Sequence, residues 1–189
     1  NRSMSSNSES IVAPGDFLGL LEKSGYSWHA KTDPSQSQNG FTVTHGTTVL
    51  AFHFKDGVLV AGDRRATAGN SIMYEECDKV IPVDDYTLMA IAGVPATAFE
   101  MARVLTHNFE YYRRSQMQTM SVEGKIRALS KLLKENVGMA VQGLGVVSPI
   151  FATYDLKFKK AAIHFFDMLG AEFKISTHTA TGSGSPTIR

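Results

Sequence analysis

Two adjacent threonines follow a glycine where the chain changes from polar, Ser-rich sequence to alternating apolar residues: Gly46, Thr47 and Thr48. At a chain terminus, Thr47 would be a complete nucleophile, because its hydroxyl attacks a carbonyl while its own α-amine accepts the proton. The pKa of such an amine in peptides is about 7.7–8.0, so it can act as a base near neutral pH. A Thr-Thr pair at a strand start also has a simpler explanation, the high β-propensity of threonine. The alternative hypothesis is a cleavage site between Gly46 and Thr47.

Further along the chain, three other residues could assist a threonine nucleophile. Asp63 ends the second strand of a predicted hairpin, which returns it to the start of the first strand. Lys79 opens the next predicted strand and would favour the deprotonated amine and hydroxyl, while Asp63 would hold the lysine in place. Gly93 lies between a strand and a helix, where exposed N–H groups could receive an oxyanion. Taken singly, each also fits a structural role, as a turn residue, a solvated strand end and a loop glycine.

The pattern of apolar residues predicts the elements that position this group. A hairpin covers 47–54 and 58–63, with the Asp56-Gly57 pair supplying the positive φ of its turn. A second strand pair lies within 79–93 and turns at Asp84-Asp85, and three more strands cover 148–155, 161–167 and 172–177. Between them, apolar stripes predict two helices: the first carries Phe99, Val104 and Leu105, and the second begins at Ser121 and carries Ile126, Leu129, Leu132, Leu133 and Val137. Because strands and helices do not alternate, an antiparallel α+β layered fold is expected.

The first 46 residues differ from the rest in being rich in Ser, Asn and Gln. Within them, a short amphipathic helix is predicted, with Asp16 as its N-cap and Gly25 as its stop. Its apolar residues are Phe17, Leu18, Leu20 and Leu21. So short a helix is not stable alone in water, so it needs a surface to lie on.

Composition narrows the possible classes of function. The chain has 189 residues, 43% of them hydrophobic, and a net charge of +1 with no long basic run, which argues against a nucleic-acid or anionic-membrane partner. Its single cysteine, Cys77, fits a reducing compartment; residues 1–30 lack the charged start and apolar region typical of a signal peptide, and no stretch approaches the length of a membrane span. The six histidines show no metal-binding spacing, and there is no phosphate-binding loop. A soluble, cytoplasmic protein without metal or cofactor is expected.

Several motifs together resemble those of proteasome β-subunits of the bacterial 20S type, which are N-terminal-nucleophile hydrolases. They are "GTTVLAFHFKDGVLVAGDRRATAGN", "CDKV", "YTLMAIAGVPATAFEMAR", "MAVQGLG" and "ATGSGSP", and they cover nearly everything from Thr47 onward. The resemblance implies an αββα sandwich of antiparallel sheets and helices. Family members continue beyond the last motif with further helices and strands, so the C-terminal part of the domain is expected to be missing here.

The resemblance also implies roles for particular residues. Thr47 is similar to the catalytic threonine, Asp63, Arg65 and Lys79 to the charge network around it, Gly93 to the oxyanion donor, and Ser183 to a serine that touches the threonine amine. Residues 1–46 are then a propeptide and 47–189 the hydrolase domain. Autocatalytic cleavage would proceed by attack of the Thr47 hydroxyl on the Gly46 carbonyl, followed by hydrolysis of the ester. The residues matching the substrate pocket are Ala66, Thr67, Cys77, Ile81, Ile91, Pro95 and Phe99, which implies a preference for large apolar residues before the cut.

The implied function is a threonine endopeptidase of a 20S core particle that degrades unfolded proteins and is inactive until the propeptide is removed. Its partners would be proteasome α-subunits and other β-subunits in stacked seven-membered rings, an ATPase regulatory ring and polypeptide substrates. One alternative is the related bacterial peptidase that pairs with an unfoldase ring, although Arg65 and the long prosegment argue against it. Others are a catalytically silent ring subunit, which retention of Thr47, Asp63, Lys79 and Gly93 disfavours, and a plain α+β binding module.

Overall fold

All strand pairs in the described part of the chain are antiparallel. The computed structural model describes residues 13–25, 48–64, 66–68, 71–74 and 77–182. A smaller sheet has the order β10-β1-β2, and a larger one the order β5-β6-β7-β8-β9. The strands are β1 Thr48–Phe54, β2 Gly57–Gly62, β5 Val80–Asp84, β6 Thr87–Ala90, β7 Ile150–Asp155, β8 Lys160–Phe166, β9 Glu172–Ile175 and β10 His178–Gly182. A separate short hairpin joins β3, Ala66–Ala68, to β4, Ser71–Tyr74.

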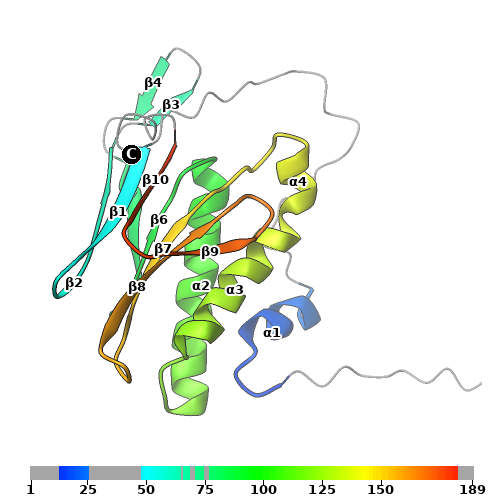
Figure 1. The fold of residues 1–189 in the computed structure, drawn as a ribbon. Coiled ribbons are helices and arrows are strands. Elements are labelled where there is room, and N and C mark those ends of the chain that lie inside the picture. The colour runs from blue at the N-terminus through cyan, green and yellow to red at the C-terminus, as the bar shows by residue number, and fades with distance from the viewer. Residues whose placement is uncertain (1–12, 26–47, 65, 69–70, 75–76, 183–189) are drawn as a thin grey trace, which may run out of the picture.

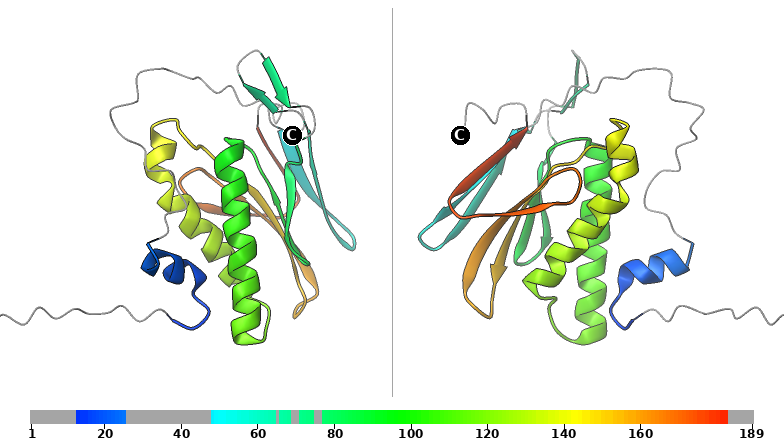
Figure 2. Two further views of the ribbon diagram at one scale, coloured as in Figure 1. Left: turned by 180° about the vertical axis from the view of Figure 1, so that it is seen from behind. Right: turned by 45° about the vertical axis from the view of Figure 1, so that its right-hand side comes forward.

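Helices cover one face of the larger sheet, and the smaller sheet lies on its other face (Figures 1 and 2). The covering helices are α2, Pro95–Gln116, and α3, Val122–Glu135, and the short α4, Val137–Val141, follows α3. This arrangement confirms the predicted α+β fold of antiparallel sheets layered with helices. Within the described residues no helix covers the outer face of the smaller sheet, where Phe52, Phe54 and Leu59 are exposed.

Two apolar clusters hold the layers together. The cluster between the two sheets contains Val49, Ala51, Ala90, Ala92, Ile150 and Ile163. The larger cluster, between the five-stranded sheet and the helices, includes Met89, Leu105, Leu129, Phe151 and Phe166, none of which exposes surface. Within the described residues, no helix is both long and apolar enough to cross a membrane.

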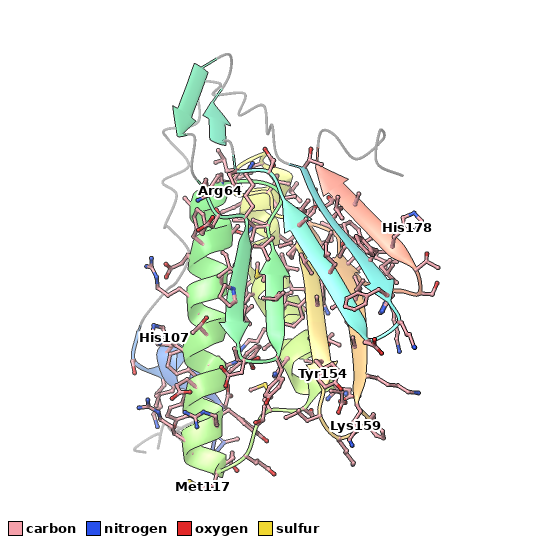
Figure 3. The ribbon with its side chains drawn as sticks, turned by 90° about the vertical axis from the view of Figure 1, so that its left-hand side faces the viewer. Arg64, His107, Met117, Tyr154, Lys159 and His178 are labelled. Atoms are coloured by element: carbon pink, nitrogen blue, oxygen red, sulfur yellow. The ribbon has the colours of Figure 1, made fainter. Side chains whose placement is uncertain are left out.

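The predicted helix near the N-terminus is α1, Phe17–Lys23. Asp16 caps it, because its Oδ1 accepts the N–H of Gly19 at 2.9 Å. The helix packs on α2: the Phe17 ring lies 5.7 Å from that of Tyr111 and 6.5 Å from that of His107, which is labelled in Figure 3, and Leu21 joins the larger core cluster. Phe17 and Leu21 thus have the surface that apolar residues of so short a helix require, whereas Leu20 is exposed and the Leu18 side chain lies outside the described part of the structure.

Several local predictions are wrong in detail. The first hairpin turns at Lys55 and Asp56, and Gly57 opens β2 without a positive φ; its missing side chain instead leaves room for the Phe54 ring, 3.2 Å from where a Cβ would lie. The second hairpin turns one residue later than predicted, because the Asp84 side chain accepts the N–H of Tyr86 at 3.0 Å. Val137 belongs to α4, not to α3, because the helix is interrupted at Asn136.

Candidate active site

The end of the smaller sheet at which β1 begins and β2 ends carries the predicted acidic residue. Asp63 follows β2 directly, and its N–H donates to the Thr48 carbonyl at 3.0 Å. Its Oδ1 accepts the Thr48 N–H at 2.8 Å. These two bonds fix the Asp63 carboxylate beside the residue that follows Thr47. Gly46 and Thr47 themselves, the predicted cleavage site and nucleophile, lie outside the described residues, as do Arg65 and Ser183.

Lys79 brings a buried cation to the same carboxylate. Its Nζ donates to Asp63 Oδ1 at 2.9 Å, and the residue is only 3% exposed. One carboxylate oxygen therefore accepts both a backbone N–H and an ammonium group. The Lys79 carbonyl accepts the N–H of Ile91 at 2.8 Å, which anchors the residue against the chain leaving β6.

Gly62 leaves the space in which Lys79 lies beside Asp63, and the sequence analysis did not identify it. A Cβ at this position would lie 3.0 Å from Val49 Cγ1 and 3.3 Å from the Lys79 Cβ. Both distances are tighter than ordinary contact, so a larger residue would push the lysine away from Asp63. The "GD" dipeptide at the end of an apolar strand was the available signal, but only Asp63 was identified from it.

A second ion pair next to the first was also missed. Arg64 Nε lies 3.1 Å from Asp78 Oδ1, and the Arg64 carbonyl accepts the Cys77 N–H at 2.7 Å. Both side chains are more than half exposed, and surface pairs of this kind contribute at most about 1 kcal/mol to stability. Figure 3 shows Arg64 at the end of the molecule opposite Met117 and Lys159, and this end carries the candidate site.

Gly93 has a conformation that only glycine tolerates. Its φ is +125°, and a Cβ would lie 2.0 Å from the Val146 carbonyl oxygen. It pairs with Val147 in an antiparallel bridge whose bonds come from its neighbours: Val94 N–H donates to the Val146 oxygen at 2.7 Å, and Ser148 N–H to the Ala92 oxygen at 2.8 Å. In such a pair the central N–H points away from the partner strand. The Gly93 N–H therefore points toward the side on which the Ile91 N–H meets the Lys79 carbonyl.

The predicted pocket positions that the structure describes come from the chain before and within β5, from the residue after β6 and from the first turns of α2. Ile91 is buried in the larger core cluster, and Ile81 and Phe99 pack against it. Pro95 is the first residue of α2, and Cys77 is half-buried next to the Lys79 segment, where burial raises the pKa of its thiol. Ala66 and Thr67 lie in β3, but their side chains are outside the described part of the structure.

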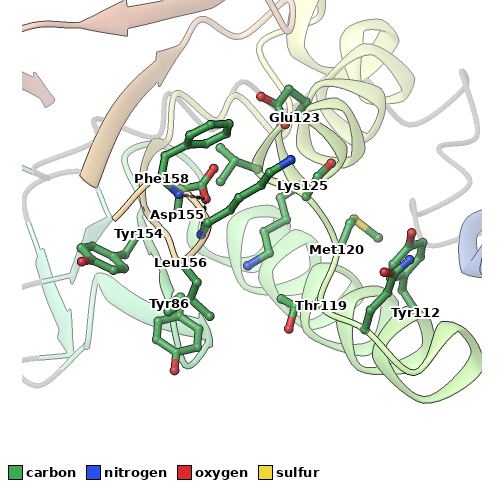
Figure 4. A pocket seen from close by; sticks show the side chains of 14 residues that line it. Tyr86, Tyr112, Thr119, Met120, Glu123, Lys125, Tyr154, Asp155, Leu156 and Phe158 are labelled. Carbon is green, nitrogen blue, oxygen red and sulfur yellow. Dashed lines mark hydrogen bonds between the residues drawn. The ribbon is translucent and has the colours of Figure 1, made fainter. Parts of the chain in front are cut away.

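A cavity of about 340 Å³ lies at the other end of the molecule. Its lining includes Tyr86, Lys125, Tyr154 and Phe158 (Figure 4), and Tyr154 lies far from Arg64 in Figure 3. The Lys125 ammonium is already bound, at 2.6 Å to Asp84 Oδ2 and at 3.0 Å to Thr87 Oγ1. The cavity contains none of the predicted site residues. No group of three or more potential metal ligands occurs among the described residues.

The described geometry can therefore support an N-terminal nucleophile at position 47. It supplies a buried cation, a carboxylate that orients it, and a backbone N–H, that of Gly93, on the side of β6 that faces the Lys79 segment. These are the groups that acyl transfer requires around a hydroxyl nucleophile.

Comparison with known proteins gives one family. The sequence model described as "Proteasome subunit" matches residues 43–189. The proteasome subunit beta of Streptomyces griseus is 40% identical over 148 residues, covering 78% of this chain and 52% of the relative. That of Acidimicrobium ferrooxidans is 37% identical over 179 residues, covering 93% and 64%. That of Streptosporangium roseum is 41% identical over 146 residues, covering 77% and 51%. The chain thus spans between about half and two thirds of the length of these relatives.

Proposed function

Because the chain belongs to the proteasome subunit family and is similar to bacterial β-subunits, we propose that it is a threonine endopeptidase of a 20S core particle. The observation that carries this proposal is the double use of Asp63 Oδ1, which accepts the Thr48 N–H at 2.8 Å and the buried Lys79 ammonium at 2.9 Å. A buried cation is thereby linked through Asp63 to Thr48, the residue after the position at which the family places its nucleophile.

In the proposed reaction, the Thr47 hydroxyl oxygen attacks the substrate carbonyl carbon while its proton passes to the Thr47 α-amine. Lys79 favours the deprotonated hydroxyl and the neutral amine through its positive charge. The Gly93 N–H donates to the oxyanion of the tetrahedral intermediate. Collapse of the intermediate breaks the C–N bond, and the departing amine takes the proton from the α-ammonium. Water then hydrolyses the ester on Thr47 and restores the enzyme.

The Thr47 hydroxyl, Lys79 and the Gly93 N–H would also act on the precursor, but without the α-amine. Residues 1–46 form the proposed propeptide, and the Thr47 hydroxyl would attack the Gly46 carbonyl. In the uncleaved chain the Thr47 nitrogen is an amide, whose lone pair is delocalised into the carbonyl, so it cannot serve as the base. We therefore expect the precursor to be inactive toward peptides. The proposed partners are α-subunits, other β-subunits in stacked rings, an ATPase ring and unfolded polypeptides, and the proposed location is the cytoplasm.

Substitution of the nucleophile tests the proposal. Thr47→Ala is expected to abolish both hydrolysis of fluorogenic peptides and removal of residues 1–46, because neither reaction has a hydroxyl to start it. Intact mass and N-terminal sequencing of the purified assembly measure processing directly. Thr47→Ser is the matched control, since it keeps a hydroxyl and should keep measurable activity.

Two outcomes would contradict the proposal. Normal processing in Thr47→Ala would exclude Thr47 as the nucleophile of the precursor. A wild-type chain that assembles but neither processes nor hydrolyses would favour the alternative of a silent ring subunit.

A further inference from the structure

We propose that Asn136 is a positioning residue for the Gly93 N–H. It would act through residues 142–148, here called the strap, which connect α4 to β7 and hold Gly93 in its orientation. The inference rests on the proposed function, because it concerns how the oxyanion donor of that site is kept in place.

Asn136 sits at the junction of α3 and α4 and is 1% exposed. Its backbone N–H meets the carbonyl oxygens of Leu132 and Leu133, both at 3.1 Å, so the last turn of α3 fixes its main chain. Its side-chain Nδ2 donates to the Gly145 carbonyl at 2.6 Å, in a buried setting. Since water does not reach a buried amide, this bond has no ready substitute. Asn136 therefore ties the strap to the end of α3.

Directly after Gly145, whose carbonyl Asn136 binds, the strap forms backbone bonds to both neighbours of Gly93. Val146 follows Gly145, and its carbonyl accepts the Val94 N–H at 2.7 Å, while the Ser148 N–H donates to Ala92 at 2.8 Å. Gly145 is close-packed as well as bonded. Its φ is +68°, and a Cβ there would lie 3.0 Å from Thr97 Oγ1, in the first turn of α2. The strap is thus held between α2 and Asn136 while it binds the residues on both sides of Gly93.

Movement of the strap would turn the Gly93 peptide. Backbone bonds to the strap hold both neighbours of Gly93, and the Val146 oxygen leaves no space where a side chain would begin. An oxyanion donor works only when it lies about 2.7–3.1 Å from the developing charge, and a displacement of about 1 Å can cost about a hundredfold in rate. Only the donor half of the Asn136 amide is used among the described residues, because its buried Oδ1 has no hydrogen-bond partner there. Loss of that NH₂ group should therefore affect the stabilisation of tetrahedral species.

The test compares Asn136→Ala with Asn136→Asp, which keeps the shape of the side chain but removes the amide donor. Both are measured in the processed, assembled protein. We expect kcat to fall by roughly 10–100-fold with KM nearly unchanged. A peptide boronate, which forms a tetrahedral adduct with the threonine hydroxyl, should lose affinity by a similar factor, whereas an uncleavable peptide should not. Amide hydrogen exchange at Val94 and Ser148 should become faster.

Asn108→Ala is the matched control, since it removes a second buried amide, 4% exposed, from α2. It should alter stability without changing the ratio of boronate to peptide affinity. If Asn136→Ala and Asn136→Asp leave that ratio and the exchange rates unchanged, Asn136 is not a positioning residue. If the wild-type protein itself is inactive, the proposed function fails instead. The exchange rates at Val94 and Ser148 then still decide whether Asn136 holds the strap, so the two failures are distinguishable.

Discussion

Among the described residues two lysines are buried, at opposite ends of the molecule, and one of them, Lys79, is linked through Asp63 to Thr48. Lys79 pairs with Asp63 at 2.9 Å, and Lys125 pairs with Asp84 at 2.6 Å; both side chains are almost fully buried while both carboxylates keep partial exposure. Removing one member of a buried pair leaves an uncompensated charge, which costs up to about 3–5 kcal/mol and less where that charge reaches water. The two pairs should therefore matter similarly for stability but differently for catalysis.

Lys79→Met is expected to reduce the rate of peptide hydrolysis by at least about a hundredfold, because the hydroxyl and amine of Thr47 lose the neighbouring cation. Lys125→Met is the matched control and should lower the free energy of unfolding while leaving the rate per folded site near wild type. Active-site titration with a covalent inhibitor separates the two effects. Equal losses of rate per folded site in both variants would show that Lys79 acts only through stability.

Substrate preference is a second prediction at this scale. The positions predicted to line the substrate pocket carry no charged side chain, so nothing among them would pair with an arginine or aspartate of the substrate; they include Cys77, Ile81, Ile91, Pro95 and Phe99. Apolar walls discriminate by burial of apolar surface. A panel of fluorogenic peptides should therefore be cleaved fastest after Leu, Phe or Tyr. Faster cleavage after Arg would overturn the assignment of these positions.

At the scale of elements, the sequence pattern predicted those helices and strands that depend on neighbouring residues in the chain. The stripe of Ile126, Leu129, Leu132 and Leu133 gave α3, and all four residues are buried, while the Ser121 side chain caps the helix by accepting the Gly124 N–H at 3.1 Å. Strand β10 was missed because its residues are mostly Thr, His and Ala, and its stability comes from pairing with β1 more than 120 residues earlier. Periodicity cannot show a partner that distant.

The residues of the candidate site also fall into those that the sequence could predict and those that it could not. Asp63, Lys79 and Gly93 could be predicted as site residues because their residue types suggest chemistry. Gly62, Asn136 and the strap were not found, because their importance lies in steric fit and in hydrogen bonds that exist only after folding. The break between α3 and α4 at Asn136 is an example: its backbone satisfies the end of α3 while its side chain serves a loop nine residues later.

A contact between a histidine and a glutamate at the edge of the larger sheet is expected to make stability depend on pH. His164 in β8 is 4% exposed, and its Nδ1 lies 2.7 Å from Glu172 Oε1 in the edge strand β9. Burial lowers the pKa of His164, and this outweighs the attraction of the Glu172 and Glu123 carboxylates, while Lys174 acts in the same direction as burial. The folded state therefore prefers the neutral imidazole, so stability is retained above the pKa of the unfolded histidine, about 6.5, and lost as pH falls below it.

Denaturant unfolding at pH 7.5 and pH 5.5 tests whether the contribution of His164 to the free energy of unfolding falls on acidification. The wild-type protein should lose more stability between these two values than His164→Gln, which cannot take up a proton. His178→Gln, at an exposed position, is the control and should behave like the wild type. A wild-type protein that gains stability relative to His164→Gln on acidification would show that the Glu172 carboxylate dominates over burial.

At the scale of the whole molecule, the proposed propeptide contacts the body far from Asp63 and Lys79. Its helix α1 packs on α2 beside His107 and Tyr111, whereas Asp63 and Lys79 lie at the end of the molecule marked by Arg64 (Figure 3). Gly15, which precedes the helix, fits closely as well: a Cβ there would lie 3.1 Å from the Tyr112 ring. The helix α1 therefore covers a surface of α2 that removal of residues 1–46 would expose.

Deleting residues 1–46, so that Thr47 starts the chain, tests whether this contact assists assembly. A seven-residue helix has little stability of its own, so α1 stays folded only through its apolar contacts with α2. The same contacts stabilise the surface of α2. We expect the truncated subunit to be active once assembled, because Thr47 then has its amine, but to form rings with α-subunits more slowly. Phe17→Ala in the full-length chain should slow assembly in the same direction, since it removes the ring that contacts Tyr111. Native gel electrophoresis over time measures both rates. If the truncated subunit and Phe17→Ala both assemble at the wild-type rate, α1 has no part in assembly, while the assignment of Thr47 as the nucleophile is unaffected.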